Sequence, residues 1–411
     1  MKKLWILFLV YSLLFLTACN RVPAEEPQIP PGLQDTVCAA DNGEYLRLPS
    51  RVIFEMSVAP GKTYNVYYNK ADGKVYPYCY DPLCSHDGGN CLASPGADAT
   101  IHTYFSEIHF IGQRFYLVSV VNGKIFSFDF DGSDMKKEYD AGYAEESLVG
   151  SVWGLGSIAY GDYIYINQHK GDDGNPHVLR FHVGKGEMED LTAKTGNYIS
   201  PMFIYNGEVY GTAPSSIVED VLVRGKYMKS DLALKSMKQI EQPNSSLYFS
   251  GSRFFRSAYD ENNTCIGIGL YDMKTGKTEV IPTASLGMPE GARPEVACVD
   301  ETYVYFYNSQ KIIIGYQPHP EKEDVTVPIY RNDGKLYRMK HDGTEPVCIC
   351  DDPEQSFDGY YAVAFDDMII IKGEYIRIQG DVVKKEGQGY RIGRLGEDGM
   401  IREWELIEAV S

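Results

Sequence analysis

Four potential metal-binding side chains lie within one short segment of this chain. Cys79, Cys84, His86 and Cys91 follow the spacing C-x4-C-x-H-x4-C. Three thiolates and one imidazole make a complete tetrahedral ligand set for zinc. Because four protein ligands leave no open coordination position, we expect a structural zinc ion here rather than a catalytic one.

Two alternatives remain open for the same cysteine loop. The spacing is not that of a common zinc finger or knuckle, so the segment does not require a metal. Outside the cytoplasm, two of the three cysteines could instead form a disulfide bond that fixes the loop. The third alternative is that the cysteines stay as free thiols. Apart from the structural zinc, we predict no cofactor.

Signatures of catalysis are missing from the sequence. Its eight histidines form no H-E-x-x-H motif, and no serine stands in a G-x-S-x-G elbow. The segment Asp129-Phe130-Asp131-Gly132-Ser133-Asp134 resembles a calcium-binding loop. A comparable repeat position holds His341-Asp342-Gly343, so turn chemistry explains the segment without an ion. We therefore predict no catalytic and no cofactor-binding residues.

A short phrase recurs along the chain, with a turn-forming pair set between aromatic and β-branched residues. Copies include Tyr160-Gly161-Asp162-Tyr163, Tyr205-Asn206-Gly207-Glu208 and Phe365-Asp366-Asp367-Met368. A second phrase follows most copies, for instance Tyr271-Asp272-Met273-Lys274-Thr275-Gly276. Asn, Asp and Gly tolerate the positive φ of hairpin turns, so both phrases predict strand, turn, strand. Two hairpins per repeat, at a period of roughly 40–50 residues, predict the four-stranded blade of a β-propeller.

The repeats predict an all-β fold, a β-propeller of seven four-stranded blades. The expected blades span approximately 44–80, 105–141, 151–193, 198–242, 246–284, 292–352 and 358–407. The fourth lacks a clear second turn after Tyr210, and the first lacks a glycine turn in its first half, so six or eight blades are alternatives. Each blade buries its faces against its neighbours, so 44–408 should form a single domain. Two insertions, 213–235 and 317–331, should project from the rim of the propeller. The insertions either bind partners there or are mobile extensions without a binding role.

The N-terminus has the features of an export signal. Lys2 and Lys3 precede an apolar run of about a dozen residues, which is too short for a lasting membrane span. The run ends in Leu16-Thr17-Ala18-Cys19, which resembles the lipobox of bacterial lipoproteins. That resemblance implies a signal peptide over 1–18 and lipidation of Cys19. An ordinary secretory signal is the alternative. The acidic, proline-containing stretch 19–43 should form a flexible tether.

The charge of the chain limits its partners. The formal net charge is −18, and loss of Lys2 and Lys3 with the signal would make it −20. Such a chain should repel nucleic acid and anionic lipid head groups. We therefore expect no nucleic-acid partner, and membrane contact through the lipid anchor alone.

The lipobox, the hairpin phrases and the cysteine loop together resemble an uncharacterised family. Its members are β-propeller lipoproteins of Gram-positive, gut-type anaerobes, with a domain of unknown function similar to low-density-lipoprotein-receptor-like propellers. The most specific match is Asp81-Pro82-Leu83-Cys84-Ser85-His86-Asp87 with Cys91. The resemblance implies a lipid-anchored protein on the extracytoplasmic face of the bacterial cell membrane.

The absence of catalytic motifs on a rigid platform favours a binding or scaffolding module for a protein or glycan ligand. The main alternative is a carbohydrate-active enzyme, a glycan lyase or hydrolase, with carboxylates or tyrosines in the central funnel. A third alternative is an assembly factor at the membrane.

Overall fold

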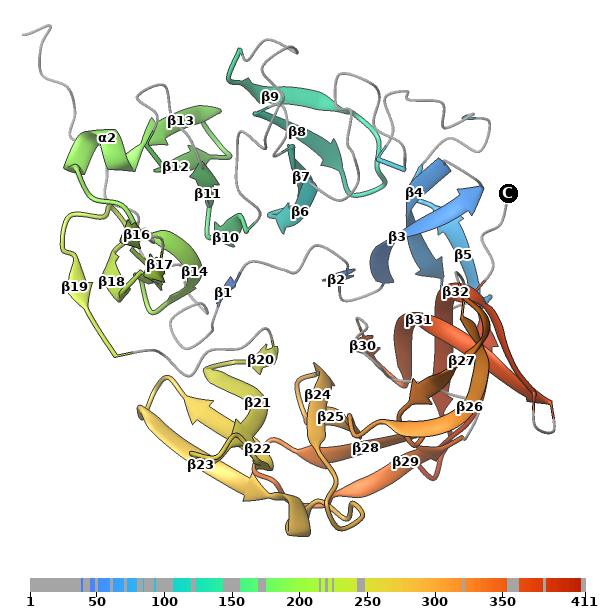
Figure 1. Ribbon diagram of the computed structural model, residues 1–411. Helices are drawn as coiled ribbons and strands as arrows, with labels where there is room; N and C mark the ends of the chain where they lie inside the picture. Colours follow the sequence, from blue (N-terminus) through green and yellow to red (C-terminus); the bar gives the residue numbers. More distant parts are fainter. Residues whose placement is uncertain are drawn as a thin grey trace, which may run out of the picture.

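The computed structural model describes most of the chain beyond its N-terminal segment. The described residues are 38–39, 45–48, 51–59, 62–69, 72–79, 84, 92–93, 106–119, 123–142, 156–168, 175–213, 216–218, 221–223, 225–241, 248–319, 322–352, 362–379 and 382–407. They form seven antiparallel sheets of at least four strands, arranged in a ring, together with two separate two-stranded ribbons (Figure 1). The predicted all-β propeller with four-stranded blades is therefore confirmed.

The first four blades run in chain order around the ring. Blade one contains β2 (Tyr45–Leu48), β3 (Arg51–Ala59), β4 (Lys62–Asn69) and β5 (Lys74–Pro77). Blade two contains β6 (Ser106–Ile111), β7 (Arg114–Ser119), β8 (Lys124–Asp129) and β9 (Lys136–Asp140). Blade three contains β10 (Ile158–Tyr160), β11 (Tyr163–Gln168), β12 (His177–His182) and β13 (Glu187–Asp190), followed by the short helix α2 (Leu191–Thr195). Blade four contains β14 (Ser200–Tyr205), β15 (Glu208–Thr212), β18 (Tyr227–Asp231) and β19 (Lys238–Gln239), with β1 (Cys38–Ala39) added beside β14.

The last three blades follow the same meander. Blade five contains β20 (Tyr248–Ser250), β21 (Arg253–Tyr259), β22 (Cys265–Asp272) and β23 (Lys277–Pro282), before a 3-10 turn at Thr283–Ser285. Blade six contains β24 (Pro294–Val299), β25 (Tyr303–Asn308), β28 (Lys335–Lys340) and β29 (Val347–Asp351). Blade seven contains β30 (Ala362–Phe365), β31 (Met368–Gln379), β32 (Val382–Leu395) and β33 (Ile401–Leu406). The ribbons are β16 (Ser216–Val218) with β17 (Val221–Val223), and β26 (Ile312–His319) with β27 (Lys322–Arg331).

The position of a strand within its blade determines whether its sequence is mainly apolar or polar. In β7 and β25, every residue after the first is buried, because blades cover both faces of these strands. The outer strand β23 is exposed at all but one of its positions and carries charged and polar residues. The continuous apolar runs in the sequence are therefore middle strands.

Blade four is complete, and its second turn explains why the sequence pattern missed it. The turn between β18 and β19 contains no glycine; instead Leu234 adopts the left-handed conformation, with φ of 56°. The Asp231 carboxylate accepts hydrogen bonds from the backbone N–H of Ala233 (2.9 Å) and Lys235 (3.0 Å). The Leu234 side chain is fully buried in the core shared by blades three and four. Core packing and a side-chain cap thus replace the expected glycine.

Blade seven meets blade one without a shared strand in the described part of the chain. The two blades instead share one apolar cluster, in which the rings of Phe54 and Tyr390 lie 4.5 Å apart, centroid to centroid. The Arg394 guanidinium donates a hydrogen bond to the hydroxyl of Tyr68 across this seam. Side-chain packing, rather than a continuous β-ladder, closes the ring here.

Candidate functional site

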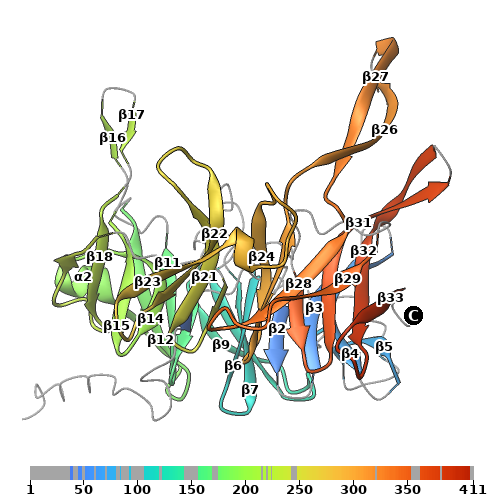
Figure 2. The same cartoon turned by 90° about the horizontal axis from the view of Figure 1, so that it is seen from below.

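Several hairpins extend far beyond their blades, and all leave the ring on the same side. The ribbons β16–β17 and β26–β27, and the long end of the β31–β32 hairpin, rise together from one face (Figure 2). All three connect the second strand of a blade to the third, and in an antiparallel meander these connections lie at the same end of every blade. The predicted insertion 317–331 lies within the ribbon β26–β27, whereas 213–235 contains the ribbon β16–β17 together with the blade strand β18.

The register of the β26–β27 ribbon places a group of large side chains on one face. Ile313 lies opposite Tyr330, and Tyr316 lies opposite Pro328. A regular strand would point Ile313 and Tyr316 to opposite sides, because they are three residues apart. A bulge between Ile313 and Gly315 corrects this, so that Ile313, Tyr316, Pro328 and Tyr330 share one face. We call these four residues the apolar ribbon face.

The apolar ribbon face is exposed to solvent. The exposed fractions are 51% for Ile313, 66% for Tyr316 and 55% for Tyr330. Ile312, on the other face of the ribbon, is 44% exposed. A two-stranded ribbon is marginally stable alone in water, and contiguous exposed apolar side chains usually mark an interaction surface.

The β21–β22 hairpin of blade five projects on the same side and adds acidic groups. Next to its turn, Tyr259 is 55% exposed and Ile266 is 38% exposed. Its turn carries the exposed residues Asp260 and Glu261. Asp260 shapes the turn by accepting the backbone N–H of Thr264 (2.8 Å). Exposed aromatic and aliphatic groups therefore lie beside negative charge on this face.

A cavity of about 450 Å³ lies at the opposite ends of the strands, between blades six and seven. The Arg338 guanidinium carbon lies 4.6 Å from the centroid of the Tyr303 ring, which also lines the cavity. The acidic residues of the lining are Asp300, Glu301, Asp366, Asp367, Glu397 and Asp398. The described residues that line it include no histidine, cysteine, serine or lysine, and its ionisable side chains are the six carboxylates, two tyrosines and Arg338.

The carboxylates of this cavity that have defined contacts stabilise turns. Asp300 accepts hydrogen bonds from the backbone N–H of Thr302 (2.7 Å) and Tyr303 (2.6 Å) and from the Tyr305 hydroxyl (2.8 Å). The backbone N–H of Met400 and the nearby Arg402 lower the pKa of Asp398, which is the opposite of what a general acid needs.

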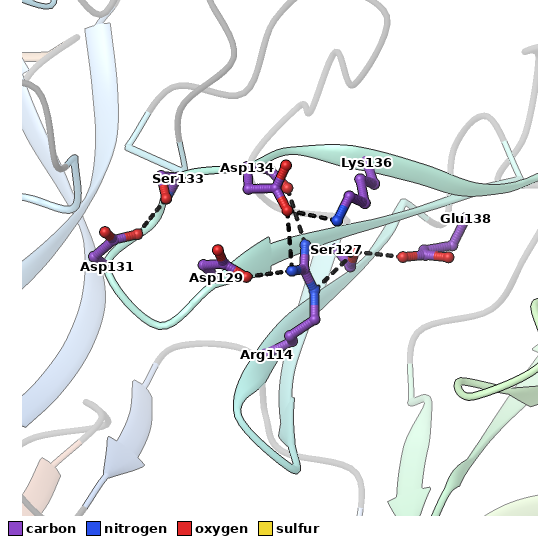
Figure 3. Close-up of polar contacts among 8 residues, drawn as sticks. All are labelled: Arg114, Ser127, Asp129, Asp131, Ser133, Asp134, Lys136 and Glu138. Atoms are coloured by element: carbon purple, nitrogen blue, oxygen red, sulfur yellow. Dashed lines mark hydrogen bonds and ion pairs between the residues drawn. The ribbon is translucent and has the colours of Figure 1, made fainter.

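The segment 129–134 is a turn in which Asp129 and Asp134 pair with cationic side chains (Figure 3). Asp129 and Asp134 both form ion pairs with Arg114, the second at 3.2 Å, and Lys136 lies 2.5 Å from Asp134. Asp131 accepts the backbone N–H of Ser133 (2.9 Å), as an Asx turn requires. The Arg114 guanidinium lies between Asp129 and Asp134, and Asp131 caps the turn, so ion pairs and turn chemistry account for this segment (Figure 3).

The sequence analysis missed a buried polar cluster between blades two and three. Glu107 accepts hydrogen bonds from the Ser157 hydroxyl and from the backbone N–H groups of Gly156 and Ser157. His109 Nε2 lies 2.6 Å from Ser157 Oγ, and because the serine proton goes to Glu107, His109 must be the donor. Ser157 is fully buried, and burial lowers the pKa of His109 to about 4. The cluster lacks a serine hydrogen-bonded to a basic imidazole, so it links the blades rather than forming a catalytic triad.

The predicted zinc site and the predicted lipidation site stay predictions. Cys79 and Cys84 are partly buried, whereas His86, Cys91 and Cys19 lie outside the described residues. Within the described ranges, no group of three or more His, Cys, Asp or Glu side chains is arranged to hold a metal ion. In that part of the chain, too, no helix is long and apolar enough to cross a membrane.

The fold and the exposed ribbons define a seven-bladed β-propeller with projecting hairpins on one face. No protein-family model and no curated protein matches this sequence. Among solved structures, the β-propeller domain of the Trilobed protease from Pyrococcus furiosus is similar over 90% of this chain and 95% of that one, at 11% identity and a TM-score of 0.42.

Two further solved structures are similar to this chain. Oligogalacturonate lyase from Vibrio parahaemolyticus matches 89% of this chain and 93% of its own, at 10% identity and a TM-score of 0.42. TolB from Acinetobacter baumannii matches 95% of this chain and 89% of its own, at 12% identity and a TM-score of 0.31. These values carry no argument about function, and the fold assignment rests on the seven sheets of this chain.

Proposed function

We propose that this protein is a lipid-anchored, extracytoplasmic binding module whose ligand is a protein that covers the apolar ribbon face. The observation that carries the proposal is the shared exposure of Ile313, Tyr316 and Tyr330 on one face of a projecting ribbon. Tyrosine is enriched at protein interfaces because its ring buries a large area while its hydroxyl keeps a hydrogen bond.

Charge supports a particular kind of protein partner. The chain has a net charge of −18, and the neighbouring hairpin adds Asp260 and Glu261. A partner with an apolar patch bordered by basic residues would be steered to this face and held by apolar burial. An anionic bilayer surface or an acidic glycan would be repelled instead.

Photo-crosslinking tests the ligand class. A benzoylphenylalanine probe would replace Tyr316 in the full chain, and cells would be irradiated before their membranes are isolated. Leu406 is the matched control position, because it is 45% exposed and apolar but lies on the outer strand β33. We expect one discrete protein adduct at 316 and none at 406, reduced about tenfold by Tyr330→Ser, as loss of one interface tyrosine predicts.

The crosslinking outcomes separate the alternatives. An adduct that forms equally at 316 and 406, or adducts that contain only lipid or glycan, would exclude a protein ligand on this face. Glycan cleavage or lyase activity that survives Tyr316→Ser with Tyr330→Ser but is lost with Arg338→Gln would favour the enzyme alternative, with its site in the cavity between blades six and seven rather than in the central funnel.

The anchor is tested separately. Lipidation of Cys19 would hold the protein at the membrane by burying acyl chains. Cys19→Ala should move the protein from the membrane fraction to the medium or leave an unprocessed precursor. Unchanged membrane association of a processed Cys19→Ala protein would contradict the lipid anchor but leave the ligand proposal intact.

A further inference from the structure

The inner edge of blade four carries an added strand from the N-terminal segment. Strand β1 pairs antiparallel with β14, with Cys38 opposite Ile204 and Ala39 opposite Phe203. Strand β14 is the innermost strand of its blade, so β1 lies on the inner side of the ring (Figure 1). Two residues of the predicted tether therefore belong to a propeller sheet.

Side-chain packing secures this strand at the junction of two blades. Strand β1 also contacts β10, the innermost strand of blade three. Cys38 packs against the apolar core that blades three and four share, which includes Tyr160 and Ile204. Burial raises the pKa of the Cys38 thiol to about 11, so it packs as a neutral group.

The next strand of the chain belongs to a distant blade. Strand β2 begins at Tyr45 in blade one, which lies across the ring from blade four (Figure 1). Six residue steps separate Ala39 from Tyr45, and an extended chain of that length spans at most about 20 Å. The short connection limits how far the two blades can separate.

We propose that the chain around Cys38–Ala39 is a strap that braces the ring from the inside. The inner edge of β14 is a strand-addition site, and its occupant is this chain's own Cys38–Ala39. The strap ties blade four to blade one, and thereby supports the seam where blades one and seven meet without a shared strand. This inference does not depend on the proposed binding function.

Hydrogen exchange on residues 20–411, which lack the predicted signal peptide and lipidation site, tests the strap. Neighbouring residues of an antiparallel pair alternate in their ladder hydrogen bonds, so Cys38→Pro with Ala39→Pro removes the donor whichever residue supplies it. We expect at least about tenfold faster exchange in peptides that cover 200–205 and in peptides of blade one. The matched control is Ala24→Pro with Glu25→Pro, which should leave both regions unchanged. Unchanged exchange in the strap variant would overturn the proposal.

A second experiment, a disulfide crosslink, tests the register of β1 with β14 even if the proline variant does not fold. Directly opposed residues of an antiparallel pair have Cα atoms about 4.5–5.5 Å apart, within the range of a disulfide. Ile204→Cys should therefore form an intramolecular disulfide with the native Cys38 under mild oxidation, and adding Cys38→Ser should abolish it. A folded Ile204→Cys protein that retains both thiols after oxidation would place the strap elsewhere and refute the assigned register.

Discussion

Ile313 and Tyr330 lie directly opposite each other in the β26–β27 ribbon, and a bulge one residue further on brings Tyr316 onto the same face. This relationship predicts opposite effects for two small changes in length. Deletion of Ile314 removes only the bulged residue, so the three side chains should keep a common face. Insertion of one alanine between Gly315 and Tyr316 should turn Tyr316 to the other face, because side chains alternate along a strand.

The measurement compares stability with ligand capture. Both variants should change the free energy of unfolding by less than about 1 kcal/mol, because the ribbon is exposed. Crosslinking from a probe at the tyrosine position should persist after the deletion and fall strongly after the insertion. Equal crosslinking in the two variants would show that the shared face is not what the partner contacts.

Gly132 should tolerate a side chain far less well than Gly112. Both glycines have positive φ, 84° and 66°, so Gly→Ala strains the backbone at either position by about 1 kcal/mol. A Cβ on Gly132 would also lie 2.9 Å from the carbonyl oxygen of Tyr78 in blade one, whereas nothing lies within 4 Å at Gly112. We expect Gly132→Ala to lower the free energy of unfolding by about 1–3 kcal/mol more than Gly112→Ala in urea titrations. Equal effects would mean that the contact between blades one and two relaxes without cost.

Stability should fall as the pH decreases from about 6.5 to about 4. The buried His109 has a pKa of about 4 in the folded protein, against 6.5 for an ordinary histidine. The unfolded chain therefore takes up a proton in this range that the folded chain cannot, which favours unfolding by up to about 3 kcal/mol at the acid end. His109→Gln, which keeps an N–H donor for Ser157, should flatten this part of the pH profile. If His109→Gln gives the same pH profile as the native chain, another group causes the acid sensitivity.

The cysteine loop predicts a bound zinc ion or a covalent link. If Cys79, Cys84, His86 and Cys91 bind zinc, purified protein should contain one zinc per chain, and chelation should lower its thermal stability. Cys84→Ser should then lose the metal, whereas Cys265→Ser, outside the loop, should retain it. Absence of metal together with two thiols gained on reduction would establish the disulfide alternative.

Local chemistry made the blades readable in the sequence. The phrases around Gly161, Gly207 and Gly276 each place a residue with positive φ between two apolar or aromatic runs, and the structure has a hairpin turn at each. The second turn of blade four was not predicted because it contains no glycine; the Asp231 carboxylate caps the turn, and the buried Leu234 adopts the positive φ. This arrangement depends on the core around Leu234, which no local sequence pattern reveals.

The all-β class and the repeated four-stranded blades can be predicted from local sequence, because turn residues and strand alternation act over a few neighbours. Which distant residues meet depends instead on how the blades pack. Glu107 and Ser157 bond across two blades, and β1 pairs with β14 on the inner side of the ring. The bulge that gathers Ile313 and Tyr316 likewise depends on the register with β27. Such contacts form only once the blades pack side by side, because their free energy comes from burial between segments that the sequence keeps far apart.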